Sequence, residues 1–276
     1  CADGVNTWRL SASTVTLDSN EGTGVARNAQ LRIKGVPILY SPYITFPIDD
    51  RRKTGFLIPS FGTSDNSGFE LRTPFYLNLA PNYDATITPR YLEDRGTQLL
   101  TEFRYLSPHN EGHVGVEYLP NDDVTNDNRS RITIRDEGRY GKHLTTDINY
   151  DRVSDKDYLN DLGDSLSLAS ITHLQRAAQA QYTTRWWQLG IQLDDYQTVD
   201  KNIAQEDRPY QRLPRTTFSM ASPFRPLGIE TQLYSEFVHF DADEQVTSDR
   251  VDLWPDISLP IRRSAFESVP KVGMRY

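Results

Sequence analysis

Hydrophobic and polar residues alternate with a period of two along much of the chain after residue 56. Residues 144–151 and 187–194 show this clearly, with mainly apolar side chains at every second position and mainly charged or amide side chains between them. A period of two places the two kinds of side chain on opposite faces of a β-strand. The best helical candidate, residues 174–180, is short and is followed by strand-like sequence. The pattern therefore predicts an all-β protein.

The connections between the predicted strands alternate between long polar loops and short turns. Residues 120–130 and 153–165 are long and acidic, residues 62–68 and 92–97 are also expected to be loops, and residues 80–83 form a tight turn. Antiparallel strands of about 9–12 residues, with short turns at one end and longer loops at the other, are typical of outer-membrane β-barrels. A soluble sandwich would share the alternation, so the loop pattern is what favours the barrel.

The first 55 residues lack strands of membrane length, and prolines interrupt them. Short strands are expected at residues 8–17, 26–34 and 36–46. We predict a soluble β-domain over residues 1–55 and barrel strands over residues 56–276. The boundary is placed at Arg51, Arg52 and Lys53, a basic cluster that could sit at a membrane interface.

Charge and composition exclude several classes of partner and fold. The 276 residues carry 30 Lys and Arg against 38 Asp and Glu, a formal charge of −8, and the basic residues are scattered. This balance argues against a nucleic-acid partner, which requires a local excess of Lys and Arg. No run of about 18 apolar residues exists, so a transmembrane helix is not expected. The chain opens with Cys1 and stops within an alternating run, which favours a piece of a longer protein.

Catalytic and metal-binding signals are weak. The sequence contains no G-x-S-x-G, H-E-x-x-H, Walker or C-x-x-C motif. A hydrolase with a Ser–His pair stays possible, because triad members need not be adjacent in sequence, but we expect no enzyme, no cofactor and no metal site. The acidic loops lack EF-hand spacing and are interpreted as solvated, with weak divalent-ion contact as the alternative. Their residues are Asp122, Asp123, Asp127, Asp155, Asp157, Asp161 and Asp164.

Several long motifs resemble one known family. GVPILYSPYITFPIDDRRKTGFLIPSFG, TPFYLNLAPNYDATITPRYLEDRG, EFRYL and VSDKDYLNDLG occur in this order. Together they resemble the LPS-assembly protein family, LptD, the outer-membrane translocons for lipopolysaccharide, over residues 8–270. The resemblance implies the end of a periplasmic β-jellyroll followed by the first antiparallel transmembrane strands of a large β-barrel. This piece would then form only a partial barrel.

The family resemblance also implies partners and a location. Expected partners are lipopolysaccharide, an LptE-like plug lipoprotein inside the barrel, an LptA-like periplasmic bridge protein and membrane lipids, with no nucleic acid. The expected location is the cell outer membrane, with the N-terminal part in the periplasm. The lipid would leave through a lateral seam and the sugar would pass through the lumen. The alternative is a passive porin-like channel, which shares the alternation and the loop pattern.

Pro59 and Pro74 are the candidate lateral gate. They lie in the first predicted membrane hairpin, residues 56–61 and 69–79, on either side of the loop at residues 62–68. Proline has no N–H for a β-ladder and so marks an edge or a defect in a strand. Two prolines beside the closing seam of a barrel would leave it weakly paired. The alternative is that both prolines merely end strands.

A segment rich in apolar residues precedes this hairpin. Its residues could line the exit of a groove for acyl chains, although an ordinary sandwich core would use the same residue types. The candidate lipid route consists of Ile33, Ile38, Leu39, Tyr40, Tyr43, Ile44 and Phe46, with Phe56 at the seam.

Cys1 and a set of charged residues complete the candidates. Cys1 allows a lipidated cysteine, a free thiol or a disulfide; the family's disulfides favour pairing with a cysteine outside this chain. The polar faces of the predicted strands give a mixed-charge lumen wall, which a hydrated interior explains and which would suit an anionic, sugar-rich headgroup. That wall comprises Glu70, Arg72, Arg90, Glu102, Arg104, Glu117, Arg131 and Arg135.

Overall fold

The computed structural model describes residues 8–33, 35–49, 51–242 and 246–276, and Cys1 lies outside them. The chain divides into two compact units, residues 1–103 and residues 104–276. Nearly all of the regular structure is β-strand, so the all-β prediction is confirmed. None of the helices described is long and apolar enough to cross a membrane.

The first unit begins with a four-stranded antiparallel sheet. Its strands are β1 (Trp8–Ser11), β2 (Thr14–Asp18), β3 (Thr23–Ile33) and β4 (Val36–Pro47), and β3 pairs with the other three. The single strand expected at residues 8–17 is two strands. Asn28 explains the break, because it has a left-handed φ of 50° and its amide donates a hydrogen bond to the Ser13 hydroxyl between β1 and β2.

The first unit continues with a second antiparallel set of strands. These are β5 (Gly55–Phe56), β6 (Ser60–Ser64), β7 (Gly68–Arg72), β8 (Phe75–Ala80), β9 (Tyr83–Leu92) and the start of β10 (Gly96–Leu106). The prediction of loops over residues 62–68 and 92–97 is wrong, since only residues 65–67 and 93–95 of these ranges lie outside strands. The two turns contact each other, with the Asp94 N–H donating to the Ser67 carbonyl. The domain boundary after residue 55 stays a prediction.

The second unit is an antiparallel sheet. Its strands are β11 (Asn110–Leu119), β12 (Arg129–Tyr140), β13 (Leu144–Val153), β14 (His173–Thr183), β15 (Trp187–Thr198), β16 (Gln211–Ala221), β17 (Glu230–Asp241), β18 (Ser248–Ser258) and β21 (Lys271–Gly273). Each strand from β11 to β17 pairs with the next in sequence, and β18 pairs with β21. Strands β11 to β18 have 10–12 residues, as predicted. The helical candidate at residues 174–180 is part of β14.

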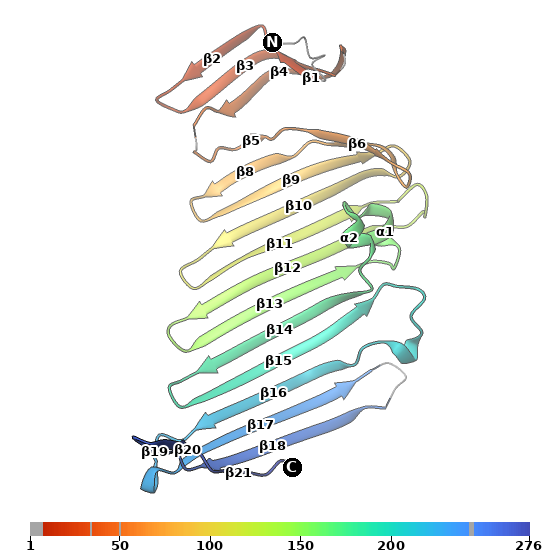
Figure 1. The fold of residues 1–276 in the computed structure, drawn as a ribbon. Coiled ribbons are helices and arrows are strands. Elements are labelled where there is room, and N and C mark those ends of the chain that lie inside the picture. The colour runs from red at the N-terminus through yellow and green to blue at the C-terminus, as the bar shows by residue number, and fades with distance from the viewer. Residues whose placement is uncertain (1–7, 34, 50, 243–245) are drawn as a thin grey trace. The chain divides into compact units, whose positions relative to one another are not determined.

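Short elements fill the connections of the second unit. Helices α1 (Tyr158–Leu162) and α2 (Leu166–Ala169) lie in the β13–β14 loop, and the 3-10 helix Gln205–Asp207 lies in the β15–β16 loop (Figure 1). These longer loops occupy one end of the strands, and the β12–β13 and β14–β15 turns occupy the other. The β16–β17 connection departs from the alternation, because it contains a second 3-10 helix, Pro226–Gly228. Strands β19 (Ile261–Arg263) and β20 (Phe266–Ser268) form a separate hairpin.

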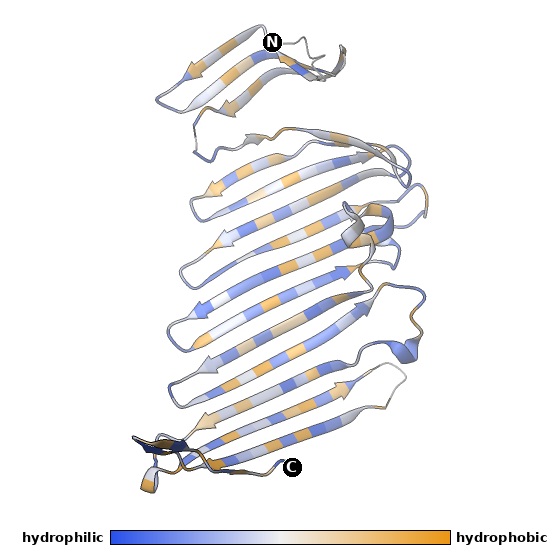
Figure 2. Ribbon diagram, in the orientation of Figure 1, coloured by the Kyte–Doolittle hydropathy of each residue, from blue (hydrophilic) through white to orange (hydrophobic). Residues whose placement is uncertain are grey.

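The second sheet has one face of apolar side chains, which is exposed, and one face of polar side chains. Register places Val116 opposite Ile132 on one face and Glu117 opposite Arg131 on the other. The apolar face is exposed, with Ile191 46% accessible, whereas charged side chains of the polar face contact one another. Figure 2 shows the alternation along each strand. A soluble sandwich would bury the apolar face, so this arrangement is the one expected of strands facing lipid.

Candidate functional site

The edge strand of the first unit contains a bulge at Pro59. Strand β5 pairs with β8 so that Phe56 stands opposite Phe75, and β6 pairs with β7 so that Ser60 stands opposite Arg72. Three residues, 57–59, therefore face only two, 73 and 74. Against β9 the register continues without a shift across Pro74, from Arg72 opposite Arg90 to Phe75 opposite Ile87, and shifts only farther along β8, between Leu77 and Ala80. The irregularity thus lies in the edge strand and its pairing.

Pro74 removes one hydrogen bond from this pairing. The Leu57 N–H donates to the Pro74 carbonyl oxygen at 2.9 Å. In an antiparallel ladder such a residue pair normally exchanges two hydrogen bonds, but Pro74 has no N–H to return. The backbone N–H of Thr73 points away from the edge strand and donates to the Pro89 carbonyl of β9 at 3.1 Å. By strand alternation the nitrogen of Pro59 points away from β7, toward the open edge.

The same edge carries apolar side chains that are exposed. Phe56 is 62% accessible, Ile58 is 90% accessible, and Leu57 and Phe61 are about half exposed. The Phe56 ring packs edge-on against the Phe75 ring, with centroids 4.9 Å apart. The edge is therefore apolar, bulged and held to β8 by few contacts.

The four-stranded sheet has an apolar face that contains two of the candidate route residues. Register places Val15 opposite Ala26 and Ala26 opposite Ile44, and the Phe46 ring lies over Gly24. Val15 is 55% accessible. Tyr43 lies on the opposite face because it alternates with Ile44, so the candidate residues do not all share one surface.

The remaining route residues are placed less fully. The Tyr40 hydroxyl donates to the Asn28 side chain at 2.8 Å. The side chains of Ile33, Ile38 and Leu39 lie outside what the structure describes. The backbone of Ile38 falls at a register shift in the β3–β4 ladder.

The basic cluster joins the two sheets of the first unit. Arg52 donates to the Ala80 carbonyl at 2.9 Å and lies 3.4 Å from the buried carboxylate of Asp84, both at the β8–β9 turn. The Lys53 ammonium donates to the Glu21 carbonyl and the Thr23 hydroxyl at the β2–β3 turn. All three basic side chains thus bind protein carbonyls, Arg51 and Lys53 at the β2–β3 turn and Arg52 at the β8–β9 turn.

The predicted wall residues lie on the polar faces of their strands, and those that form ion pairs include Glu70, Arg72, Arg90, Glu117 and Arg131. In the first unit the Arg90 guanidinium lies 2.9 Å from Glu70, and Arg72 lies 3.5 Å from the same carboxylate. Glu102 and Arg104 alternate with Phe103 along β10. Because positive and negative side chains of this wall lie close together, their charges compensate one another and the wall is close to neutral.

The wall of the second unit is also paired. Arg131 lies 2.8 Å from Asp151 and 3.6 Å from Glu117, which also accepts a hydrogen bond from the Tyr158 hydroxyl at 2.8 Å. Arg135 donates to the carbonyls of residues 134 and 150.

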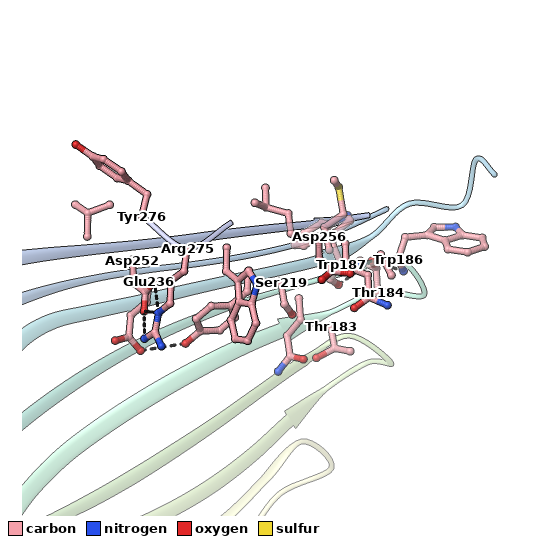
Figure 3. Close-up of a pocket in the computed structure, with 18 of the residues that line it drawn as sticks. Thr183, Thr184, Trp186, Trp187, Ser219, Glu236, Asp252, Asp256, Arg275 and Tyr276 are labelled. Carbon is pink, nitrogen blue, oxygen red and sulfur yellow. Dashed lines mark hydrogen bonds and ion pairs between the residues drawn. The ribbon is translucent and has the colours of Figure 1, made fainter. Parts of the chain in front are cut away.

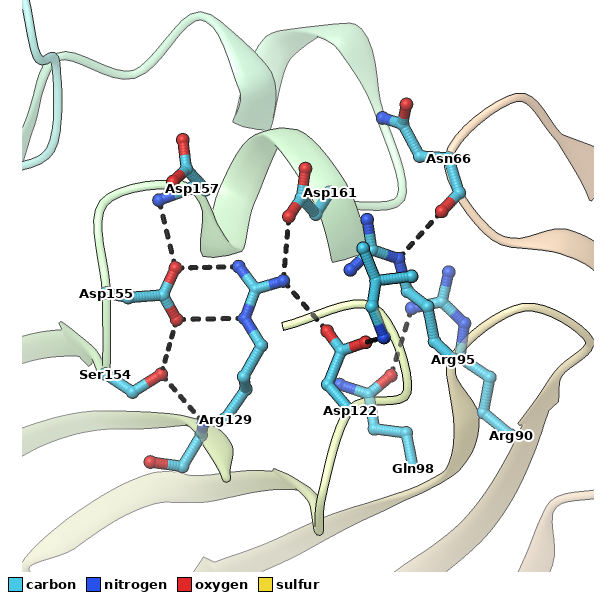
Figure 4. Close-up of polar contacts among 12 residues, drawn as sticks. Asn66, Arg90, Arg95, Gln98, Asp122, Arg129, Ser154, Asp155, Asp157 and Asp161 are labelled. Carbon is cyan, nitrogen blue, oxygen red and sulfur yellow. Dashed lines mark hydrogen bonds and ion pairs between the residues drawn. The ribbon is translucent and has the colours of Figure 1, made fainter. Parts of the chain in front are cut away.

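The acidic loops converge on one buried guanidinium. Arg129, the first residue of β12, is 1% accessible and binds Asp122 at 3.2 Å, Asp155 at 2.7 Å and Asp161 at 2.8 Å (Figure 4). The Tyr158 ring packs against the same guanidinium, 5.6 Å from its centroid. The interpretation of these loops as solvated is therefore wrong for Asp122, whose side chain is 0% exposed, whereas the side chains of Asp161 and Asp155 are 18% and 37% exposed. Within the described ranges, no group of His, Cys, Asp and Glu could hold a metal ion.

Two opposing effects act on the Asp155 carboxyl. Burial favours its neutral form and would raise the pKa. Hydrogen bonds from Arg129, from the Ser154 hydroxyl and from the Asp157 N–H favour the carboxylate and outweigh burial, so the pKa of Asp155 lies below its usual value of 3.8. The carboxylate is therefore charged at neutral pH, and its ion pair with Arg129 holds the start of the β13–β14 loop in place.

Comparison with known proteins shows the family of the chain. A family model described as "LptD: LPS transport system D" matches residues 127–276. The chain belongs to the LptD family. LPS-assembly protein LptD of Nitrosococcus oceani is 42% identical over the whole chain, and that of Aliivibrio fischeri is 37% identical over the whole chain. The same-named protein of Pseudomonas aeruginosa is 37% identical over 96% of the chain. The chain spans only 38%, 35% and 32% of these three relatives.

The chain contains a further charged cluster that the sequence analysis missed. A cavity of about 990 Å³ is lined by β15 to β18 and the last residues of the chain (Figure 3). Beside it Glu236 accepts hydrogen bonds from Arg215 and Arg250, and Arg275 binds Asp252 at 2.5 Å. Period-two alternation places Glu236 on the polar face, but only the structure shows that Arg215 and Arg250, which stand opposite Val238 in the register, both reach its carboxylate.

Proposed function

We propose that this chain is the end of a periplasmic β-jellyroll and the first barrel strands of an outer-membrane translocon for lipopolysaccharide. Lipid would leave sideways at the seam formed by β5 and β6, and sugar would pass through the lumen. The observation that carries the proposal is the bulged, apolar edge strand at Pro59, paired with a Pro74 that returns no hydrogen bond. Such an edge opens at low cost, and its exposed phenylalanines suit acyl chains.

The route to the seam would run along the first sheet. The apolar face containing Val15, Ile44 and Phe46 offers acyl chains a surface, and Phe56 of the seam stands nine residues after Pro47, where the sheet ends. Arg52 and Lys53 would keep the linker fixed between the two sheets. Residues 1–55 would then be periplasmic and residues 56–276 would lie in the cell outer membrane.

The proposed partners follow from this division of the chain into a periplasmic part and a membrane part. An LptA-like bridge protein would deliver lipopolysaccharide to the jellyroll, and an LptE-like lipoprotein would occupy the lumen against the paired, near-neutral wall. No chemical step is assigned to the chain, so the energy would come from lipid pushed along the bridge. Cys1 would form a disulfide with a cysteine elsewhere in the full-length protein. Cys1→Ser should abolish a redox-dependent gel shift, and a parent without any shift would refute the disulfide.

In-cell photocrosslinking in the full-length protein tests the route. A photoreactive amino acid replaces Phe46, Phe56 or Phe75 singly, and the adducts are blotted for lipopolysaccharide. Trp187, at the β14–β15 turn, is the control position. Adducts at the three phenylalanines but not at Trp187 are expected. A correctly inserted protein that gives no adduct at any of them would favour a passive porin-like channel instead.

A further inference from the structure

The apolar face of the second unit ends at one row of residues. Along β15, Ile191 and Leu193 are followed on the same face by Asp195. Register places Arg176 of β14 opposite Asp195 and opposite Tyr150 of β13. Arg176 and Asp195 form an ion pair of 2.9 Å. On this face the side chains therefore change from apolar to charged toward the end that carries the longer loops.

A basic cavity lies at this row. It has a volume of about 300 Å³ and is lined by Lys156, Arg176 and Arg208, with Thr198, Gln205 and Gln211 as neutral polar neighbours. Among the described residues that line it, none is acidic. The carboxylate closest along the row, Asp195, already binds one terminal nitrogen of Arg176. The cavity therefore carries an excess of positive charge.

Two of the residues that line this cavity carry a buried donor without a protein acceptor. The Nε–H groups of Arg176 and Arg208 are shielded from solvent and have no hydrogen-bond partner in the described part of the chain. Leaving a buried donor unpaired costs about 1–3 kcal/mol. Such an arrangement favours a ligand that brings anionic oxygens into the cavity.

We propose that this cavity binds a phosphate group on the saccharide of lipopolysaccharide. The proposal rests on the proposed function, because only a membrane-spanning sheet places the Arg176 row at the headgroups of the outer leaflet. Guanidinium groups present parallel N–H donors that match phosphate oxygens, and Lys156 adds a third charge for a dianion. Thr198, Gln205 and Gln211 could hydrogen-bond sugar hydroxyls beside it. The same phosphate chemistry occurs in glycerophospholipids, so the test must separate the two sources.

Arginine labelling tests the site directly. The full-length protein is treated with phenylglyoxal in detergent, and peptide mass spectrometry measures the rate at which Arg208 and Arg185 are modified. Arg185, at the β14–β15 turn, lies at the opposite end of β14 and stacks on Trp186 at 4.7 Å, so it serves as an internal control. Lipopolysaccharide, phosphatase-treated lipopolysaccharide and phosphatidylglycerol are added in separate arms.

Lipopolysaccharide should slow the labelling of Arg208 but not of Arg185, and the other two lipids should protect neither. Lys156→Gln should raise the lipopolysaccharide concentration needed for protection by about tenfold, the value of one charge-assisted hydrogen bond. Equal protection by phosphatase-treated lipopolysaccharide would overturn the phosphate assignment, and equal protection by phosphatidylglycerol would overturn the assignment to lipopolysaccharide. Seam crosslinks to lipopolysaccharide without protection of Arg208 would refute this site alone, whereas loss of both would refute the proposed function.

Discussion

Pro74→Ala should tighten the edge pairing by one hydrogen bond. The Leu57 N–H already donates to the carbonyl of residue 74, so an alanine there can return its own N–H to the Leu57 carbonyl. One such bond contributes about 1 kcal/mol, which lowers the population of the open edge about fivefold. Pro59→Ala restores a donor on the open side of the edge, where a closing strand would pair. The double variant should therefore shift opening by about 2 kcal/mol, roughly 30-fold.

Amide hydrogen exchange of the full-length protein measures this change. Exchange of the Leu57 N–H, which reports opening of the β5–β8 pair, should slow about fivefold in Pro74→Ala, and less lipopolysaccharide should reach the cell surface. Pro89→Ala is the matched control. Its carbonyl accepts a hydrogen bond from Thr73 inside the sheet, so it makes the same chemical change in a ladder away from the edge.

The control decides the outcome. Both substitutions raise the entropy of the unfolded chain similarly, so a difference between them reports the edge. If Pro89→Ala slows exchange at Leu57 and export as much as Pro74→Ala does, the reasoning about the seam is refuted. Unchanged surface lipopolysaccharide in the double variant would count against the gate even if exchange slows.

Three further predictions concern the loops and the route. Arg129→Met leaves the buried Asp122 carboxylate, and the partly exposed Asp155 and Asp161, without their cation. It should destabilise the loop contacts by about 3–5 kcal/mol, seen as faster proteolysis of residues 154–172, whereas Arg139→Met at an exposed position should have no effect. Because the pKa of Asp155 is depressed below 3.8, its stabilising contact is present above that pH and is lost as the pH falls further. Exchange at residues 154–165, corrected for its intrinsic pH dependence, should thus stay constant from pH 8 to pH 5 and rise below about pH 4; loosening above pH 5 would contradict this. Ile44→Asp should reduce surface lipopolysaccharide and Thr45→Asp, on the opposite face, should not; equal effects would indicate simple unfolding.

The period-two pattern alone was enough to predict the strands and their two faces. Strand length is set by local alternation, and for this reason β11 to β18 match the expected 9–12 residues. The connections were predicted less well, since residues 62–64 are polar or small and resemble a loop while they pair as β6 at a sheet edge. Hydropathy patterns predict strands that bury one face. Strand β6 is exposed along its whole length, so its sequence carries no such pattern.

Tertiary structure decided what the charges and prolines do. The sequence marked Pro59 and Pro74 as defects, but only the register shows that Pro74 withholds a bond from Leu57 while the nitrogen of Pro59 points to the open edge. The acidic loops looked solvated because Arg129 and its carboxylates are separated by up to 32 residues. Alternation assigns a side chain to a face, a local property, whereas its partner is fixed by pairing between strands that are distant in sequence.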